Sequence, residues 1–118
     1  MSPAAQLEAQ IATEVRRLVD RLATLTSTRL AEPAPPYASR AAAVHAFAQH
    51  LVDVTAALEN RTIPVLPWID ELTVADQLAV TAQDLQTALA AGDPSATNTR
   101  GELTDLLEDV RRVRAAVR

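Results

Sequence analysis

Two rows of acidic side chains are the clearest candidates for chemistry in this 118-residue chain. Asp76 and Asp84 lie eight residues apart, and Glu102, Asp105 and Asp109 follow at spacings of three and four. Such spacings place carboxylates on one helix face, and aligned acids on neighbouring helices can hold Mg²⁺ for phosphate chemistry. Solvated polar faces are the more ordinary interpretation of both rows, and we expect that one.

The tetrapeptide Glu102-Leu103-Thr104-Asp105 is similar to one motif of the all-α pyrophosphohydrolases, which hydrolyse nucleoside triphosphates. That family pairs Glu-x-x-Asp with Glu-x-x-Glu around a shared cavity, and Glu-x-x-Glu does not occur in this sequence. A Mg²⁺-dependent all-α nucleotide phosphohydrolase is therefore kept only as an alternative function.

The remaining catalytic and metal chemistries have little support. His45 and His50 lie five residues apart, about 140° around a helix, so they cannot share a metal ion from one face; His50 and Asp53 share a face and can form a pair. The chain has no cysteine and no lysine, and its serines lack a nucleophile elbow. We predict no catalytic residue, no metal site and no cofactor.

The charge of the chain is uneven. Residues 62–110 hold nine acids and one arginine, whereas Arg111, Arg112, Arg114 and Arg118 cluster at the end. Such a cluster usually complements the negative end of a helix dipole. The alternative is a clamp on an acidic partner, including the acidic stretch of a second copy, which salt would weaken. A broad basic face is missing, so we expect no nucleic-acid binding.

An apolar segment with two prolines, residues 62–69, interrupts the helical pattern. Proline lacks a backbone donor and disfavours helix in the residue before it, so this segment should be extended. The side chains of Val65, Leu66, Trp68 and Ile69 either close the end of the core or bind a partner, because tryptophan is common at binding hot spots. Closure of the core by Trp68 is the favoured interpretation.

Four stretches have helical apolar spacing. The first is expected from Pro3, capped by Ser2, to about Leu30, and the second from a start between about Tyr37 and Ser39 to an end at Asn60 and Arg61. The third is expected from Pro67 or Thr73 to the residue before Gly92, and the fourth from about Glu102 to the end. Asp93-Pro94 is ambiguous between a loop and a first helical turn. The first helix is the longest, so its apolar end from Leu25 to Leu30 should lack an internal partner and favour association.

The composition agrees with this pattern: alanine and leucine dominate, and only two glycines occur. We predict an all-α fold, an antiparallel up-down four-helix bundle with a proline-rich apolar connection between its second and third helices, formed as one domain by residues 1–118. No stretch is apolar enough to span a membrane, and a basic leader is missing, so a cytoplasmic location is expected.

These patterns favour a non-enzymatic protein that acts through protein–protein interaction, as an adaptor, regulator or assembly subunit, and that self-associates. The expected contact residues come from the apolar segment, the end of the first helix and the basic end: Val65, Leu66, Trp68, Ile69, Leu25, Leu30, Arg111, Arg112, Arg114 and Arg118. A bundle that binds a small molecule in an apolar pocket near Phe47 and Trp68 is the first alternative, ahead of the phosphohydrolase.

Overall fold

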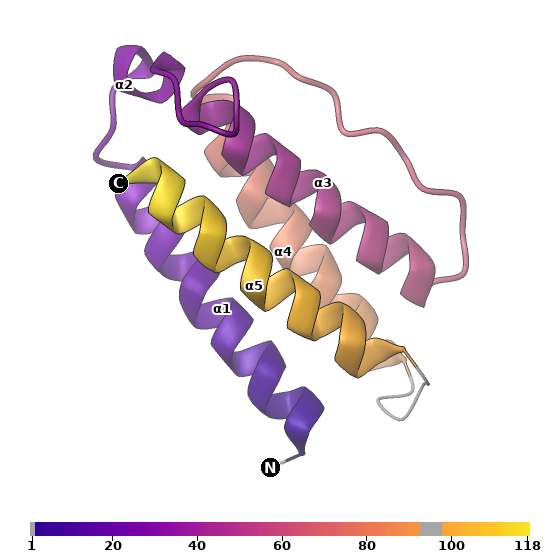
Figure 1. The fold of residues 1–118 in the computed structure, drawn as a ribbon. Coiled ribbons are helices and arrows are strands. Elements are labelled where there is room, and N and C mark those ends of the chain that lie inside the picture. Colours follow the sequence, from indigo (N-terminus) through magenta and orange to yellow (C-terminus); the bar gives the residue numbers. More distant parts are fainter. Residues whose placement is uncertain (1, 93–97) are drawn as a thin grey trace.

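Five helices make up most of residues 2–92 and 98–118, the residues described by this computed structural model. They are α1 (Pro3–Leu22), α2 (Ser27–Ala31), α3 (Arg40–Leu58), α4 (Thr73–Ala91) and α5 (Thr99–Val117) (Figure 1). The predicted all-helical class is confirmed, but the predicted count of four is wrong. No helix in these residues is long and apolar enough to cross a membrane.

The first predicted helix is divided into α1 and α2. It begins as predicted, with Pro3 in the first turn and the Ser2 hydroxyl accepting from the Ala5 N–H. It ends at Leu22 rather than near Leu30, because hydroxyl side chains cap the chain in between. Thr24 donates to the Arg21 carbonyl at 2.7 Å, and Thr26 caps α2 by accepting from a backbone N–H. Threonine competes with helical hydrogen bonds in this way.

The apolar residues from Leu25 to Leu30 were expected to lack a partner within the protein, but they are covered by it. Leu30, in α2, is only 2% exposed, because α2 packs against α3. Leu25, in the connection before α2, is half-buried against the core. The division of the first helix thus folds this apolar stretch back onto the protein, and the expected unpartnered end does not exist.

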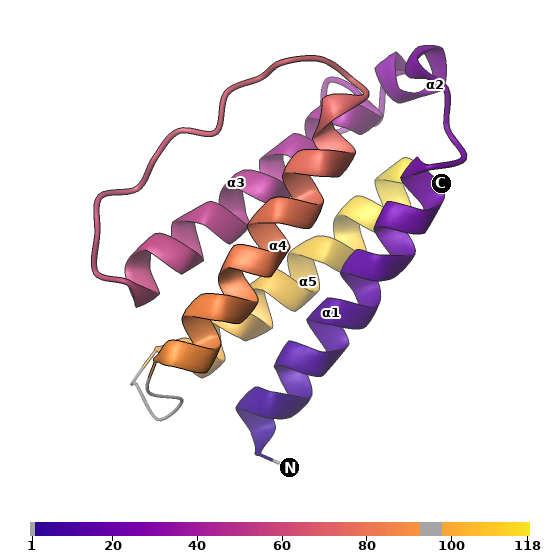
Figure 2. The same cartoon turned by 180° about the vertical axis from the view of Figure 1, so that it is seen from behind.

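The strict up-down order is also wrong, because α3 and α4 run in the same direction (Figures 1 and 2). Residues 59–72 return along the outside of α3 before α4 begins. A helix of 19 residues is about 28 Å long, and extended chain covers about 3.3 Å per residue, so about nine extended residues suffice for the return. The prolines keep the segment extended; we call residues 62–72 the strap.

The core lies between the four long helices, each of which packs against two others. α1 and α5 are parallel, α3 and α4 are parallel, and the two pairs run in opposite directions (Figure 2). The apolar stripes read from the sequence supply this core. Its largest fully buried side chains are Leu18, Val44, Phe47, Leu51, Val74, Leu78, Leu103, Leu106, Val110, Val113 and Val117.

The other helix boundaries follow local capping. Ser39 caps α3 by accepting from the Ala42 N–H at 3.0 Å, and Gly92 follows the last residue of α4 as predicted. Of the two possible starts for α4, the structure has Thr73, whose N–H and hydroxyl both donate to Asp70. These bonds hold the pKa of Asp70 below its ordinary value. The ambiguous Asp93-Pro94 pair lies outside the described residues.

Candidate functional site

The strap is fixed to the helices through its backbone. Gln49 of α3 accepts from the Leu66 N–H at 2.6 Å and donates to the Pro64 carbonyl at 3.0 Å. The His45 ring, also on α3, lies 3.0 Å from the Leu66 carbonyl oxygen, and Gln77 of α4 donates to the Pro67 carbonyl at 2.8 Å. Polar side chains of two helices therefore hold an extended segment that has no regular hydrogen bonds of its own.

Because the strap turns backbone groups toward the helices, several of its large apolar side chains face solvent. Val65 is 86% exposed, and the exposed set is Ile63, Val65, Trp68, Ile69 and Leu72. Trp68 is 47% exposed, so the expectation that it closes the core is wrong. Its ring meets the His45 ring edge-on, with centroids 5.5 Å apart. Leu66 alone among the four predicted contact residues of this segment is half-buried.

The basic end forms part of a cleft between α1 and α5. Arg111, Arg114 and Arg118 line it together with Arg17 and Arg21 of α1, and the cleft encloses about 350 Å³. Arg112, also predicted as a contact residue, lies outside this lining and pairs with Asp109 at 3.5 Å. The contribution of α1 was missed, although the four-residue spacing of Arg17 and Arg21 in the sequence places them on one helix face.

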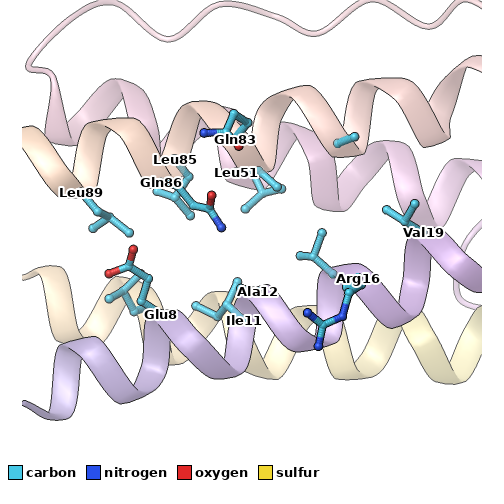
Figure 3. A pocket seen from close by; sticks show the side chains of 14 residues that line it. Glu8, Ile11, Ala12, Arg16, Val19, Leu51, Gln83, Leu85, Gln86 and Leu89 are labelled. Atoms are coloured by element: carbon cyan, nitrogen blue, oxygen red, sulfur yellow. The ribbon is translucent and has the colours of Figure 1, made fainter. Parts of the chain in front are cut away.

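An apolar groove of about 260 Å³ separates α1 from α4 (Figure 3). Ile11, Ala12 and Val15 of α1 face Leu85 and other apolar side chains of α4. The pocket was predicted near Phe47 and Trp68, but neither residue lines this groove: Phe47 is fully buried, and Trp68 is half-exposed beside His45. Small side chains explain the groove, since Ala12 and the α4 residues Ala79 and Ala82 leave space between the helices.

His50 and Asp109 form a close pair of titratable side chains. His50 Nδ1 lies 2.8 Å from Asp109 Oδ2, so His50 pairs across helices rather than with Asp53, which accepts from Gln49. The hydrogen bond to Asp109 raises the pKa of His50; burial opposes this, and the charges of Asp109, Asp53 and Asp105 add to it. Within residues 2–92 and 98–118, no three His, Asp or Glu side chains come close enough to hold a metal ion.

The acidic rows therefore bring together no group of three such ligands in the part of the chain that is described. Comparisons of the chain with protein-family models, with curated proteins and with solved structures give no match. The described residues offer three surfaces suited to binding: the strap, the groove between α1 and α4, and the cleft between α1 and α5.

Proposed function

We propose that this protein is a non-enzymatic interaction module that binds another protein through the strap. The observation that carries the proposal is the row of exposed apolar side chains on a segment that four side-chain-to-backbone hydrogen bonds hold in place. Contiguous exposed apolar surface is typical of protein-binding sites. A segment that is already ordered loses little conformational entropy on binding, which favours affinity.

The charges around the strap indicate the chemistry of the partner. Residues 53–76 contain five acids and one arginine, and that arginine, Arg61, already pairs with Glu59 at 3.2 Å. Asp70 and Glu71 directly follow the exposed Trp68 and Ile69. The partner that fits is therefore a protein surface with apolar side chains at its centre and basic side chains at its border.

Capture of proteins from the source organism with matched variants tests this proposal. Val65→Asp places a charge at the centre of the strap, whereas Val80→Asp places one at an exposed position on α4, outside the strap. We expect a basic partner that the wild type and Val80→Asp retain and Val65→Asp loses. The purified partner should then shift the emission of the half-exposed Trp68 to shorter wavelength. A captured set that is the same for all three proteins, or unchanged Trp68 emission, would overturn the proposal.

We also propose that the protein pairs with a second copy, and the observation that favours this lies on α1 beside the groove. Glu8, Ala12 and Arg16 are spaced by four residues and all line the groove (Figure 3). Two antiparallel α1 helices that cross at Ala12 would place Glu8 of each copy opposite Arg16 of the other, because both lie about 6 Å from Ala12 along the helix. A two-fold interface requires this kind of self-complementarity.

Charge exchange tests the pairing. Sedimentation equilibrium should detect a wild-type dimer that Glu8→Arg or Arg16→Glu alone disrupts, because each single variant opposes like charges twice. The double variant Glu8→Arg/Arg16→Glu restores the complementary pairs, so the dimer should return. Arg100→Gln, an exposed substitution outside the groove, should leave the dimer intact. A wild-type monomer, or a double variant no more associated than the single ones, contradicts this pairing.

A further inference from the structure

The cleft between α1 and α5 gathers arginines that lie far apart in the sequence. Its lining consists of Glu14, Arg17, Leu18, Arg21, Arg111, Arg114, Ala115 and Arg118, and we call it the arginine cleft. On α1, Arg17 and Arg21 are four residues apart and therefore lie on one helix face. The three arginines of the lining at the end of the chain follow one another at spacings of three and four, so they also share one face. Because the two helices are parallel and neighbouring, those faces meet near the carboxyl ends of both (Figure 1).

One buried acid sits among these bases. Glu14 is 8% exposed, and its carboxylate accepts from Arg17 at 3.4 Å and from Arg114 on α5. This single carboxylate is far from neutralising the cleft. Five guanidinium groups and one carboxylate leave a formal side-chain charge of +4 there, in a chain whose net side-chain charge is −4. The cleft is thus a concentrated positive site on an otherwise strongly acidic protein.

Helix dipoles explain only part of the cluster. Arg21 lies in the last turn of α1 and Arg114 in the last turn of α5, where a cation is stabilised by the carboxyl end of the helix. Arg17 lies before the last turn of α1, and Arg111 lies one turn before Arg114, so neither is placed at a helix end. Repulsion among the cations of the cleft disfavours the folded state, and a bound anion would reduce it.

The chemistry of the lining selects the anion. Guanidinium groups offer planar pairs of N–H donors that match the oxygens of a phosphoryl group, and they are weakly hydrated. Leu18 and Ala115 are the apolar part of the lining, which contains no aromatic side chain to stack on a base. A volume of about 350 Å³ equals that of roughly a dozen liquid waters, at about 30 Å³ each. A compact anion of two or three linked phosphoryl groups fits this space.

We propose that the arginine cleft binds such a polyphosphate anion and recognises it through the phosphoryl groups alone. The proposal is independent of partner binding by the strap and of pairing through α1, because the cleft shares no lining residue with either. The anion takes the place of the missing countercharge between α1 and α5. It should therefore stabilise the folded protein as well as bind to it.

Calorimetric titration with inorganic triphosphate at low salt tests the proposal. We expect saturable binding that weakens as salt rises, and an increase in the unfolding temperature with ligand. Arg111→Gln and Arg118→Gln should each weaken binding about tenfold, because a charge-assisted hydrogen bond is lost. The matched control Arg100→Gln, on α5 but outside the cleft, should bind like the wild type. Glu14→Gln should bind triphosphate more tightly, although it loses its ion pairs. If the arginines served only to stabilise the fold, this gain in affinity would not be expected.

Two further titrations identify the source of the phosphoryl groups. Inorganic pyrophosphate and adenosine triphosphate should both bind, and adenosine triphosphate should bind no more tightly than inorganic triphosphate, because the lining has nothing to hold the base. The proposal is overturned by the absence of saturable triphosphate binding, by equal affinity in the wild type and the cleft variants, or by binding that requires the nucleoside.

Discussion

The ring of His50 on α3 lies 2.8 Å from the carboxylate of Asp109 on α5, and this contact joins the two antiparallel helices. The pKa of His50 is raised above its ordinary value of 6.5, mainly because the protonated ring donates to that carboxylate. A group whose pKa is higher in the folded than in the unfolded state stabilises the fold when it is protonated. The contribution is complete below pH 6.5 and is lost as pH rises through the raised pKa.

We therefore predict that His50→Gln lowers the free energy of unfolding more at about pH 5.5 than at about pH 9. The difference should be about 1 kcal/mol or less, because the His50 side chain is 32% exposed and solvent screens the pair. Urea unfolding at both pH values measures it. Asp109→Asn should remove the same pH dependence, whereas Arg112→Gln, which removes the more exposed partner of Asp109, should keep it. An equal effect of His50→Gln at both pH values would contradict the assignment.

The centre of the core depends on the one phenylalanine of the chain. Phe47 is fully buried, so Phe47→Ala removes a large apolar side chain and leaves a cavity between the helices. Such truncations cost about 3–5 kcal/mol of the free energy of unfolding. Chemical denaturation followed by circular dichroism should show a loss of this size. Val80→Ala, at an exposed apolar position on α4, should change stability by less than about 0.5 kcal/mol.

Arg40 connects three parts of the chain. It donates to the Arg29 carbonyl at 3.0 Å, to Glu32 at 3.2 Å and to the Arg118 carbonyl at 3.2 Å, so it ties the α2 region and the end of α5 to the start of α3. Arg40→Gln should lower the unfolding free energy by about 1–3 kcal/mol, because the side chain is only 17% exposed.

Arg29→Gln is the matched control, since Arg29 also pairs with Glu32, at 3.8 Å, but is 65% exposed. It should cost no more than about 0.5 kcal/mol. Hydrogen exchange in α2 should rise in Arg40→Gln and not in the control. Equal losses of unfolding free energy in Arg40→Gln and Arg29→Gln would contradict the prediction that the more buried arginine contributes more to stability.

The sequence predicted the helices where apolar spacing and a cap agree. The cap Ser2 and the end of α4 before Gly92 were predicted correctly, because helix periodicity and capping are local properties. The break after Leu22 was missed, because the helical spacing of apolar residues continues through Leu25. The threonine hydrogen bonds that end the helix do not alter this spacing, so the sequence pattern does not reveal them.

The direction of α4 and the candidate sites depend on contacts between distant segments. Gln49 and Gln77 hold the strap against α3 and α4, and the sequence gives no reason to single them out. The arginine cleft likewise needs α1 and α5 to be parallel neighbours. Three of its five arginines belong to the predicted basic end, and only the topology adds Arg17 and Arg21.

Gln49 is the main attachment of the strap, because its side-chain amide makes hydrogen bonds both to the Leu66 N–H and to the Pro64 carbonyl. Gln49→Ala should free this segment while α3 and α4 stay packed, since the side chain adds nothing to the core. The Leu66 amide should then exchange with solvent at least about tenfold faster, which corresponds to a loss of roughly 1.4 kcal/mol in local stability. Hydrogen-exchange mass spectrometry measures this directly.

Gln6→Ala, at an exposed position on α1, should leave exchange in the strap unchanged. A strap that is no longer held in place should also bind the partner less tightly, because binding must then pay the entropy of ordering the segment. Gln49→Ala should therefore weaken partner binding without altering any residue of the exposed apolar row. Unchanged exchange at Leu66 in Gln49→Ala would mean that His45 and Gln77 alone hold the strap, and partner affinity should then also stay at the wild-type value.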